Sequence, residues 1–151
     1  MEHEHFMLEA LAEARAAAEI DETPVGAVMV REGKIIARGH NLRELCNDPT
    51  AHSEMIVIRE ASRVLGGWRL TDCTLYVTLE PCIMCAGTMV LARLPKLVFG
   101  AFDPRAGAAG SVIDVLTTNN FNHKVEVVGG VLAHESGMLL KEFFKDLRQR
   151  K

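Results

Sequence analysis

The sequence predicts an α/β protein of three layers, α/β/α, built around a central five-stranded mixed sheet. Three observations predict this class: short apolar runs of strand length, amphipathic helical segments that alternate with them after about residue 50, and a tight turn between the first two strands. The chain of 151 residues is 48% hydrophobic and 25% charged, as globular proteins usually are. This length suits one domain, so we expect residues 1–151 to form a single domain.

The first third of the chain predicts a helix followed by an antiparallel hairpin. Residues 4–19 carry apolar side chains at helical spacing among good helix formers. Residues 25–30 are a short apolar run and predict a buried strand. A turn that contains Gly33 leads into a second strand at residues 34–39. Residues 41–51 are polar and predict a loop.

A helix and a strand are expected next, followed by a second helix. The first helix covers about residues 52–65 and ends at Gly66, because glycine commonly terminates helices. The apolar run at residues 74–79 predicts the third strand. Pro81 opens the next helix, where its missing N–H costs nothing, and this helix runs to about Arg93.

The last third predicts two more strands and a terminal helix. We expect strands at residues 96–101 and 124–128, a short helix near 112–116, and a final helix over 134–148. The alternation of strands and helices favours a hairpin at one edge of the sheet and parallel pairs elsewhere.

Cysteine usage and the N-terminal sequence predict a reducing, cytoplasmic setting. The segment Met1–His5 lacks the basic-then-apolar order of a signal peptide, and no apolar run approaches the roughly 18–20 residues that span a bilayer. We therefore expect no membrane partner. In such a setting, a Cys-x-x-Cys pair predicts a metal or redox site, whereas Cys46 and Cys73 are expected to be ordinary free thiols.

One pattern carries the chemistry: His52-Ser53-Glu54, followed by Pro81-Cys82-Ile83-Met84-Cys85. His52, Cys82 and Cys85 supply three zinc ligands, and three protein ligands leave tetrahedral zinc an open position for water. Both cysteines fall at a predicted helix start, which favours the thiolate that binds metal.

Glu54 is placed to handle protons, because a general acid–base group beside an activated water typically contributes about 10²–10⁴ in rate. An alternative makes Glu54 a fourth zinc ligand, which would close the open position. The Cys-x-x-Cys pair alone would fit a thioredoxin-like redox pair equally well. The joint occurrence of His52, Glu54 and the pair favours a zinc-dependent hydrolase, and it is the pattern of zinc-dependent nucleobase deaminases.

The chain resembles the bacterial tRNA adenosine deaminases of the cytidine deaminase superfamily from about residue 6 to 149. Beyond the zinc pattern, the resemblance rests on the segments Pro24–Val28, Asp48–His52, Thr78–Cys82, Gly107–Ser111, Asn122-His123 and Phe143-Phe144. It implies a cytidine deaminase-like fold and one cytidine/deoxycytidylate deaminase-type catalytic domain. One departure is Ser53, where the family usually has Ala. Its hydroxyl could bond within the first helical turn.

The resemblance implies the reaction and its centre. The enzyme would convert adenosine to inosine at the wobble position, 34, of the arginine tRNA with anticodon ACG, as a hydrolase acting on a cyclic amidine C–N bond. His52, Cys82 and Cys85 would hold one Zn²⁺ per subunit. Activated water would attack C6 of adenine while Glu54 moves a proton to the ring and ammonia leaves. Glu80 is expected to support a ligand rather than to catalyse.

The resemblance also implies contacts with the tRNA anticodon stem-loop. Asn41 would hydrogen-bond the target base or its ribose, and Asp103 would lie near the anticodon backbone. Asn122 and His123 would contact loop nucleotides. The family forms homodimers in which both subunits line the RNA site.

The C-terminal helix is implied to serve the same RNA, Phe144 by stacking and Lys145 and Arg148 by charge. Of Phe143 and Phe144, one is expected in the core, and the sequence does not decide which. The net charge of −3 argues against binding nucleic acid by bulk charge, but residues 141–151 form a local basic strip. A solvated helix end would explain the same charges.

Two other functions fit parts of the sequence. A deaminase of a free nucleobase or nucleoside, guanine or cytosine, would use the same ligands and Glu54. The basic C-terminal helix and the segments Gly107–Ser111 and Asn122-His123 favour the tRNA enzyme. A zinc-stabilised RNA-binding module without catalysis would need no general base, so Glu54 argues against it.

Overall fold

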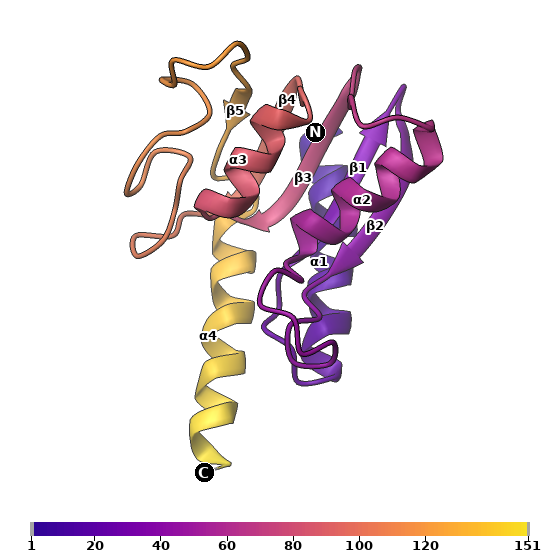
Figure 1. Ribbon diagram of the computed structural model, residues 1–151. Helices are drawn as coiled ribbons and strands as arrows, with labels where there is room; N and C mark the ends of the chain where they lie inside the picture. The colour runs from indigo at the N-terminus through magenta and orange to yellow at the C-terminus, as the bar shows by residue number, and fades with distance from the viewer. Residues whose placement is uncertain (1, 151) are drawn as a thin grey trace.

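The computed structural model describes residues 2–150, and Met1 and Lys151 lie outside the described residues (Figure 1). The strands of this part are β1 (Gly26–Arg31), β2 (Lys34–His40), β3 (Cys73–Leu79), β4 (Lys96–Ala101) and β5 (Glu126–Val128). Its helices are α1 (Glu2–Glu19), α2 (Ser53–Leu65), α3 (Ile83–Leu91) and α4 (Ala133–Gln149). No described helix combines the length and the apolar character needed to cross a bilayer.

The strands form one mixed sheet in the order β2-β1-β3-β4-β5, which confirms the predicted five-stranded α/β fold. β1 is antiparallel to β2, and β3, β4 and β5 run parallel. The expectation of parallel pairs everywhere outside the hairpin is wrong for β1 and β3, which pair antiparallel. The reason is the crossover through α2, which links β2 and β3 as parallel strands while β1 lies between them.

Helices cover both faces of the sheet and bury two apolar layers (Figure 1). On one face, α1 places Phe6 and Met7 against Val28 and Tyr76. On the other face, α2 and α3 pack on the sheet through a larger cluster that contains Val57, Ala61, Met89, Leu75 and Leu97. Full burial of a side chain such as Leu or Met stabilises the fold by about 1.5–3 kcal/mol. This packing holds the starts of α2 and α3 at the end of β3.

Gly26 lets α1 lie directly on the start of β1. A Cβ at Gly26 would overlap the backbone of Ala10 and Ala14, both of which are fully buried. The absence of a side chain at this position therefore allows the close approach of helix and strand.

Two boundaries near the predicted site differ from expectation. α3 begins at Ile83, and Cys82 precedes it with extended backbone, so Pro81 lies ahead of the helix and does not open it. The short helix expected near 112–116 is absent from the described structure, where residues 109 and 114 form only an isolated bridge. The Asp114 carboxylate accepts the backbone N–H groups of Leu116 and Thr117, which competes with helix formation.

The structure also decides between the two aromatic residues of α4. Phe143 is buried, at 8% exposure, and belongs to the core, whereas Phe144 is 42% exposed. Their rings meet edge to face with centroids 5.4 Å apart. Phe144 is therefore the one available to a ligand.

Candidate active site

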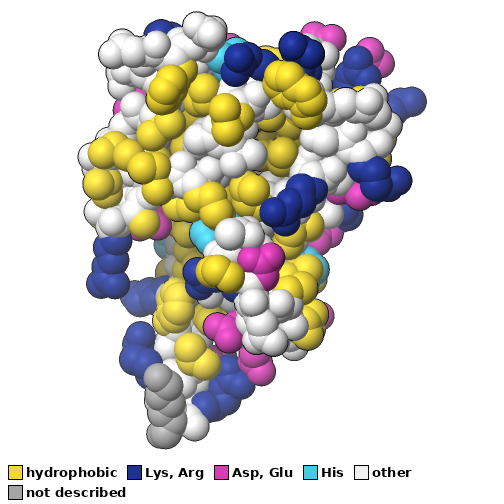
Figure 2. Space-filling model, viewed as in Figure 1, with side chains coloured by type: hydrophobic (Ala, Val, Ile, Leu, Met, Phe, Trp, Pro, Cys, Tyr) yellow, Lys and Arg dark blue, Asp and Glu magenta, His cyan; other side chains and the backbone are white. Residues whose placement is uncertain are grey.

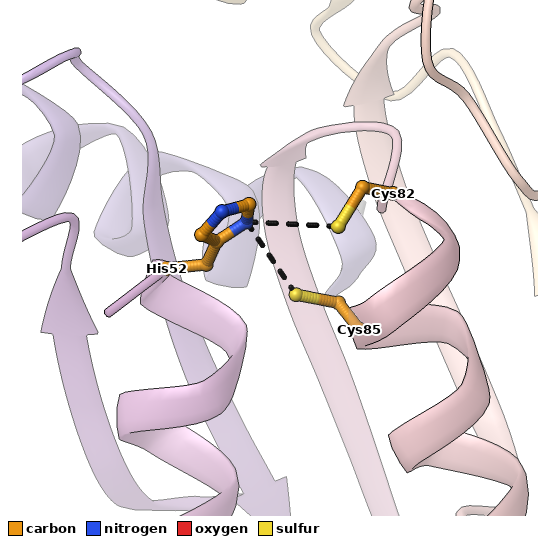
Figure 3. Close-up of side chains that lie close together, drawn as sticks. All are labelled: His52, Cys82 and Cys85. Atoms are coloured by element: carbon orange, nitrogen blue, oxygen red, sulfur yellow. Dashed lines mark hydrogen bonds between the residues drawn. The ribbon is translucent and has the colours of Figure 1, made fainter. Parts of the chain in front are cut away.

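Two helix starts bring the three predicted zinc ligands together beyond the end of β3. His52 precedes α2, while Cys82 precedes α3 and Cys85 lies in its first turn. The His52 Nδ1 atom lies 3.7 Å from the Sγ atoms of both cysteines (Figure 3). All three ligand atoms lie within 4.8 Å of one another.

This arrangement fits a tetrahedral metal ion. Zn–S bonds of about 2.3 Å and Zn–N bonds of about 2.0 Å place tetrahedral ligand atoms about 3.6 Å apart. The observed distances of 3.7 Å match that spacing. One imidazole nitrogen and two sulfurs are a donor set that zinc favours.

The cysteine pair is already polarised toward a thiolate. A hydrogen bond from Cys85 and another from His52 outweigh burial and lower the pKa of Cys82 to about 3. The hydrogen bond to Cys82, together with burial, raises the pKa of Cys85. The hydrogen bond with Cys82 likewise raises the pKa of His52. Cys82 therefore ionises first, and thiolate is the form that binds metal.

Glu54 lies in the first turn of α2 beside the ligands but outside the ligand group. It is 3% exposed, and burial is the main reason that its pKa is raised. The Ser53 hydroxyl donates a 2.9 Å hydrogen bond to the Glu54 Oε1 atom, so the side chain that departs from the family pattern holds the carboxylate. Among residues 2–150, the group of potential ligands contains His52, Cys82 and Cys85 and not Glu54.

A cavity of about 230 Å³ opens onto His52, Cys82 and Glu54. Its remaining lining residues come from the end of β3 and from the loops around it: Thr23, Val25, Asn41, Arg43, Leu79, Glu80, Asp103 and Ala106. A pocket that joins a metal-ligand group, a buried carboxylate and an amide has the parts expected of a hydrolytic site.

Asn41 lines this cavity and is 6% exposed. Its Oδ1 atom accepts a 2.7 Å hydrogen bond from the backbone N–H of Ser53. The oxygen of the amide is thus used within the protein, and the Nδ2 donor remains for a ligand.

Glu80 organises the loop on one side of the cavity. Its carboxylate accepts the backbone N–H groups of Asp103, Ala109 and Ser111 at 2.9–3.0 Å, and also the Ser111 hydroxyl. Burial raises the pKa of Glu80, but these hydrogen bonds outweigh it and lower the pKa overall. A Cβ at Gly107 would overlap the carboxyl group, which explains the glycine there.

Glu22 organises a second loop, a role that no sequence pattern predicts. It is 1% exposed, and its carboxylate accepts the backbone N–H groups of Glu44 and Leu45 at 3.1 and 2.6 Å. No motif surrounds this residue, so only the tertiary contacts reveal it.

A second, more apolar groove of about 380 Å³ adjoins the cavity and shares Thr23, Leu79 and Asp103 with it. Phe144 lines this groove, as does Phe102, which is 58% exposed and was not predicted from the sequence. Asp103 is partly committed, since its Oδ1 atom accepts the backbone N–H groups of Arg105 and Ala106.

The other predicted RNA-binding residues lie farther from the cavity. Lys145 and Arg148 are exposed on α4. Asn122 lines a separate groove of about 470 Å³ with Leu91 and Phe121. The His123 Nε2 atom lies 2.6 Å from the Leu94 carbonyl oxygen. Within one chain, neither Asn122 nor His123 lines the catalytic cavity.

A mixed five-stranded sheet with a His–Cys–Cys group and a buried glutamate at two helix starts defines a deaminase of the cytidine deaminase-like class. The family model of MafB19-like deaminases matches residues 1–148. The chain belongs to the family of tRNA-specific adenosine deaminases. The protein of that name from Bacillus subtilis (strain 168) is 55% identical over 148 residues, which cover 98% of this chain and 92% of the relative.

Other relatives agree with this assignment. The tRNA-specific adenosine deaminase of Aquifex aeolicus (strain VF5) is 48% identical over 98% of this chain and 97% of its own length. A structure from work on A-to-I editing by tRNA:A34 deaminases is 46% identical, with a TM-score of 0.86, and the match covers 90% of this chain and 99% of that one. One solved structure has a different activity in its name: guanine deaminase from Bacillus subtilis is 43% identical with a TM-score of 0.65, over 68% and 66% of the respective chains.

Proposed function

We propose that this deaminase converts adenosine to inosine at wobble position 34 of the arginine tRNA with anticodon ACG, in a zinc-dependent hydrolysis. The observation that carries the proposal is the junction of a His–Cys–Cys group, a buried Glu54 and an Asn41 donor in one cavity. Near full-length similarity to tRNA-specific adenosine deaminases supports the choice of substrate.

In this proposal His52, Cys82 and Cys85 hold one Zn²⁺ per subunit. When bound, Zn²⁺ lowers the pKa of its water toward about 7 and so supplies a nucleophile at neutral pH. The Glu54 carboxylate would take one proton from the attacking water and deliver it to a ring nitrogen as the water oxygen bonds to C6. The same carboxylate would then move the remaining proton of that oxygen to the amino group, so that the C6–N6 bond breaks and ammonia leaves. The raised pKa of Glu54, due mainly to burial, suits a group that both takes and returns a proton.

Asn41 and the adjoining groove would position the RNA. The Asn41 Nδ2 donor faces an acceptor of the target base or its ribose, because its Oδ1 atom is bonded to Ser53. Asp103 borders both the cavity and the groove where Phe144 is exposed, and a neighbouring base could stack there. Lys145 and Arg148 would attract phosphates from α4.

We further propose that the enzyme acts as a homodimer in the cytoplasm, with residues 1–151 as one catalytic domain. Exposed hydrophobic side chains of α3 and the following loops support a dimer: Ile83 at 64%, Leu91 at 70% and Phe121 at 66%. Figure 2 shows hydrophobic side chains gathered over this part of the molecule. A second subunit bound there could place its own Asn122 and His123 near the RNA. Within one chain these two residues lie away from the catalytic cavity.

A free-base deaminase is the second candidate, and the similarity to guanine deaminase from Bacillus subtilis favours it. One measurement distinguishes the two functions. Zinc-loaded protein is incubated with an anticodon stem-loop bearing ACG, and inosine at the wobble position is measured beside turnover of free guanine and cytosine. We expect inosine in the stem-loop. Turnover of a free base without inosine formation would contradict the proposal.

A further inference from the structure

Arg43 is the basic residue at the catalytic cavity. Among the described residues that line this cavity, no other is a lysine or an arginine. The same cavity is lined by the carboxyl groups of Glu54, Glu80 and Asp103. A phosphate group that approaches this cavity therefore meets one guanidinium and several acids.

The Arg43 side chain is available for a ligand. It is exposed, and no carboxylate of residues 2–150 lies within 4.0 Å of it as an ion pair. Arg38, by contrast, is paired with Glu9 at 2.7 Å. A free guanidinium beside a reactive cavity needs no rearrangement within the protein before it binds an anion.

The backbone at Arg43 is held although the loop is exposed. The Glu22 carboxylate binds the N–H groups of the next two residues, Glu44 and Leu45. On the other side, the Leu42 N–H donates to the Ala51 carbonyl oxygen at 3.0 Å. The Arg43 carbonyl oxygen itself accepts the N–H of Asp48 at 3.0 Å. These bonds hold the backbone from which the side chain extends. Less conformational entropy is therefore lost when the side chain binds a ligand.

The same cavity also carries the opposite charge. Asp103 lines it, and its carboxylate is oriented by the backbone N–H groups of Arg105 and Ala106. Like charges repel and opposite charges attract most strongly where water is partly excluded. Among the charged groups at this cavity, a phosphate of a bound nucleotide is therefore attracted by the Arg43 guanidinium and repelled by the Asp103 carboxylate.

We propose that Arg43 binds a phosphate that adjoins the target nucleotide and thereby makes the enzyme prefer a nucleotide within a polynucleotide over a free base or nucleoside. The inference rests on the proposed RNA substrate. A guanidinium suits this role because its planar donors can bind two phosphate oxygens at once. A free base has no phosphate, so it would gain nothing from Arg43.

The test measures RNA binding separately from deamination. Fluorescence anisotropy gives the affinity of the protein for three ACG stem-loops: one with all phosphates intact, and two with a neutral methylphosphonate on the 5′ or the 3′ side of the target nucleotide. We expect Arg43→Gln to weaken binding of the intact RNA about tenfold and to reduce the slope of log Kd against log salt by about 1. Arg43→Lys keeps the charge and should recover part of the loss.

The neutral linkages locate the contact. One of them should weaken binding by the wild-type protein by a similar factor and leave Arg43→Gln unchanged, since the contact is already lost. Arg69→Gln is the matched control, because Arg69 is an exposed arginine beyond the opposite end of α2, where it lies 4.3 Å over the Trp68 ring. This control should bind all three RNAs as the wild type does.

Two results would overturn the inference. In the first, Arg43→Gln binds the intact RNA with the affinity and salt slope of the wild type. In the second, each neutral linkage weakens RNA binding by Arg43→Gln further and by the same factor. The proposed function is judged by inosine formation in the wild type. Absence of inosine with an Arg43-dependent phosphate contact would contradict the function and support the contact. Inosine formation without that contact would support the function and contradict the contact.

Discussion

The side-chain oxygen of Asn41 accepts a 2.7 Å hydrogen bond from the backbone N–H of Ser53, the first residue of α2. These residues are separated by the polar loop between β2 and α2. His52, which precedes the helix, makes no side-chain cap of its own, because its ring faces the two cysteines. Asn41 therefore joins two tasks: it binds a free N–H at the helix start and directs its own amide nitrogen to the cavity.

The two tasks of Asn41 can be separated by substitution. Asn41→Asp keeps an acceptor for the Ser53 N–H and removes the donor, so we expect stability close to wild type and a large loss of deamination. Asn41→Ala removes both and should also lower the free energy of unfolding by about 1–3 kcal/mol, because a buried N–H is left unpaired. Denaturant unfolding and inosine formation measure the two effects. Equal stability of the two variants would show that the hydrogen bond does not stabilise α2.

Glu54→Gln should lower deamination activity and raise the stability of the metal-free protein. We expect zinc binding to persist and deamination to fall by about 10²–10⁴, because the amide cannot take up the proton. Metal content that falls with activity would instead make Glu54 a ligand.

The same variant should show a pH-dependent gain in stability. Burial raises the pKa of Glu54, so its folded state binds a proton more tightly than its unfolded state. The stability that this provides is present below the ordinary Glu pKa and is lost as pH rises through the raised value. In the metal-free protein, the Tm of Glu54→Gln relative to wild type should therefore increase from pH 4 to pH 8. Glu60→Gln, at a partly exposed position of the same helix where a hydrogen bond from Arg63 lowers the pKa of Glu60, serves as the control and should show no such gain.

Glu80→Gln should loosen the loop at residues 103–111 and lower stability by about 1.5–3 kcal/mol at pH 7, because hydrogen bonds to a charged acceptor are lost. Its hydrogen bonds lower the pKa of Glu80 against the effect of burial. The stability from this group is therefore present above the ordinary Glu pKa and is lost as pH falls through the lowered value. The difference from wild type should shrink below about pH 4.5. Faster amide exchange at Ala109 and Ser111 would locate the change; unchanged exchange there would contradict it.

Removal of zinc should destabilise the protein reversibly. A ligand at one hundred times its Kd stabilises the folded state by about 2.7 kcal/mol, so a chelator should lower the Tm and added Zn²⁺ should restore it. Cys85→Ser should remove this response, because it replaces a ligand sulfur at a fully buried position. Cys73→Ser, also a buried cysteine but outside the ligand group, should keep the response to zinc. A Tm that ignores chelator in the zinc-loaded wild type would contradict a metal at this site.

Local sequence patterns were enough to predict most of the fold and the chemical centre. The strand at residues 96–101 was predicted with its observed bounds, and the first long helix within two residues, because apolar periodicity reports which face of an element is buried. The prediction of a short helix near 112–116 was wrong because the N–H groups of this segment bind the Gly107 and Ala108 carbonyl oxygens and the Asp114 carboxylate instead. The expectation of a parallel pair was wrong for β1 and β3, because their relative direction depends on the path of α2 over the sheet.

By itself, the sequence determined that one histidine, two cysteines and a glutamate would stand at two helix starts, since each short motif fixes its own residues within one or two helical turns. Only the tertiary structure decided what surrounds them. It placed Phe143 in the core and Phe144 at a groove, made Glu22 and Glu80 the supports of two loops, and brought Arg43 to the cavity. These relations join residues about 20 or more positions apart, and such contacts form only when the whole sheet packs, so no local pattern of residues encodes them.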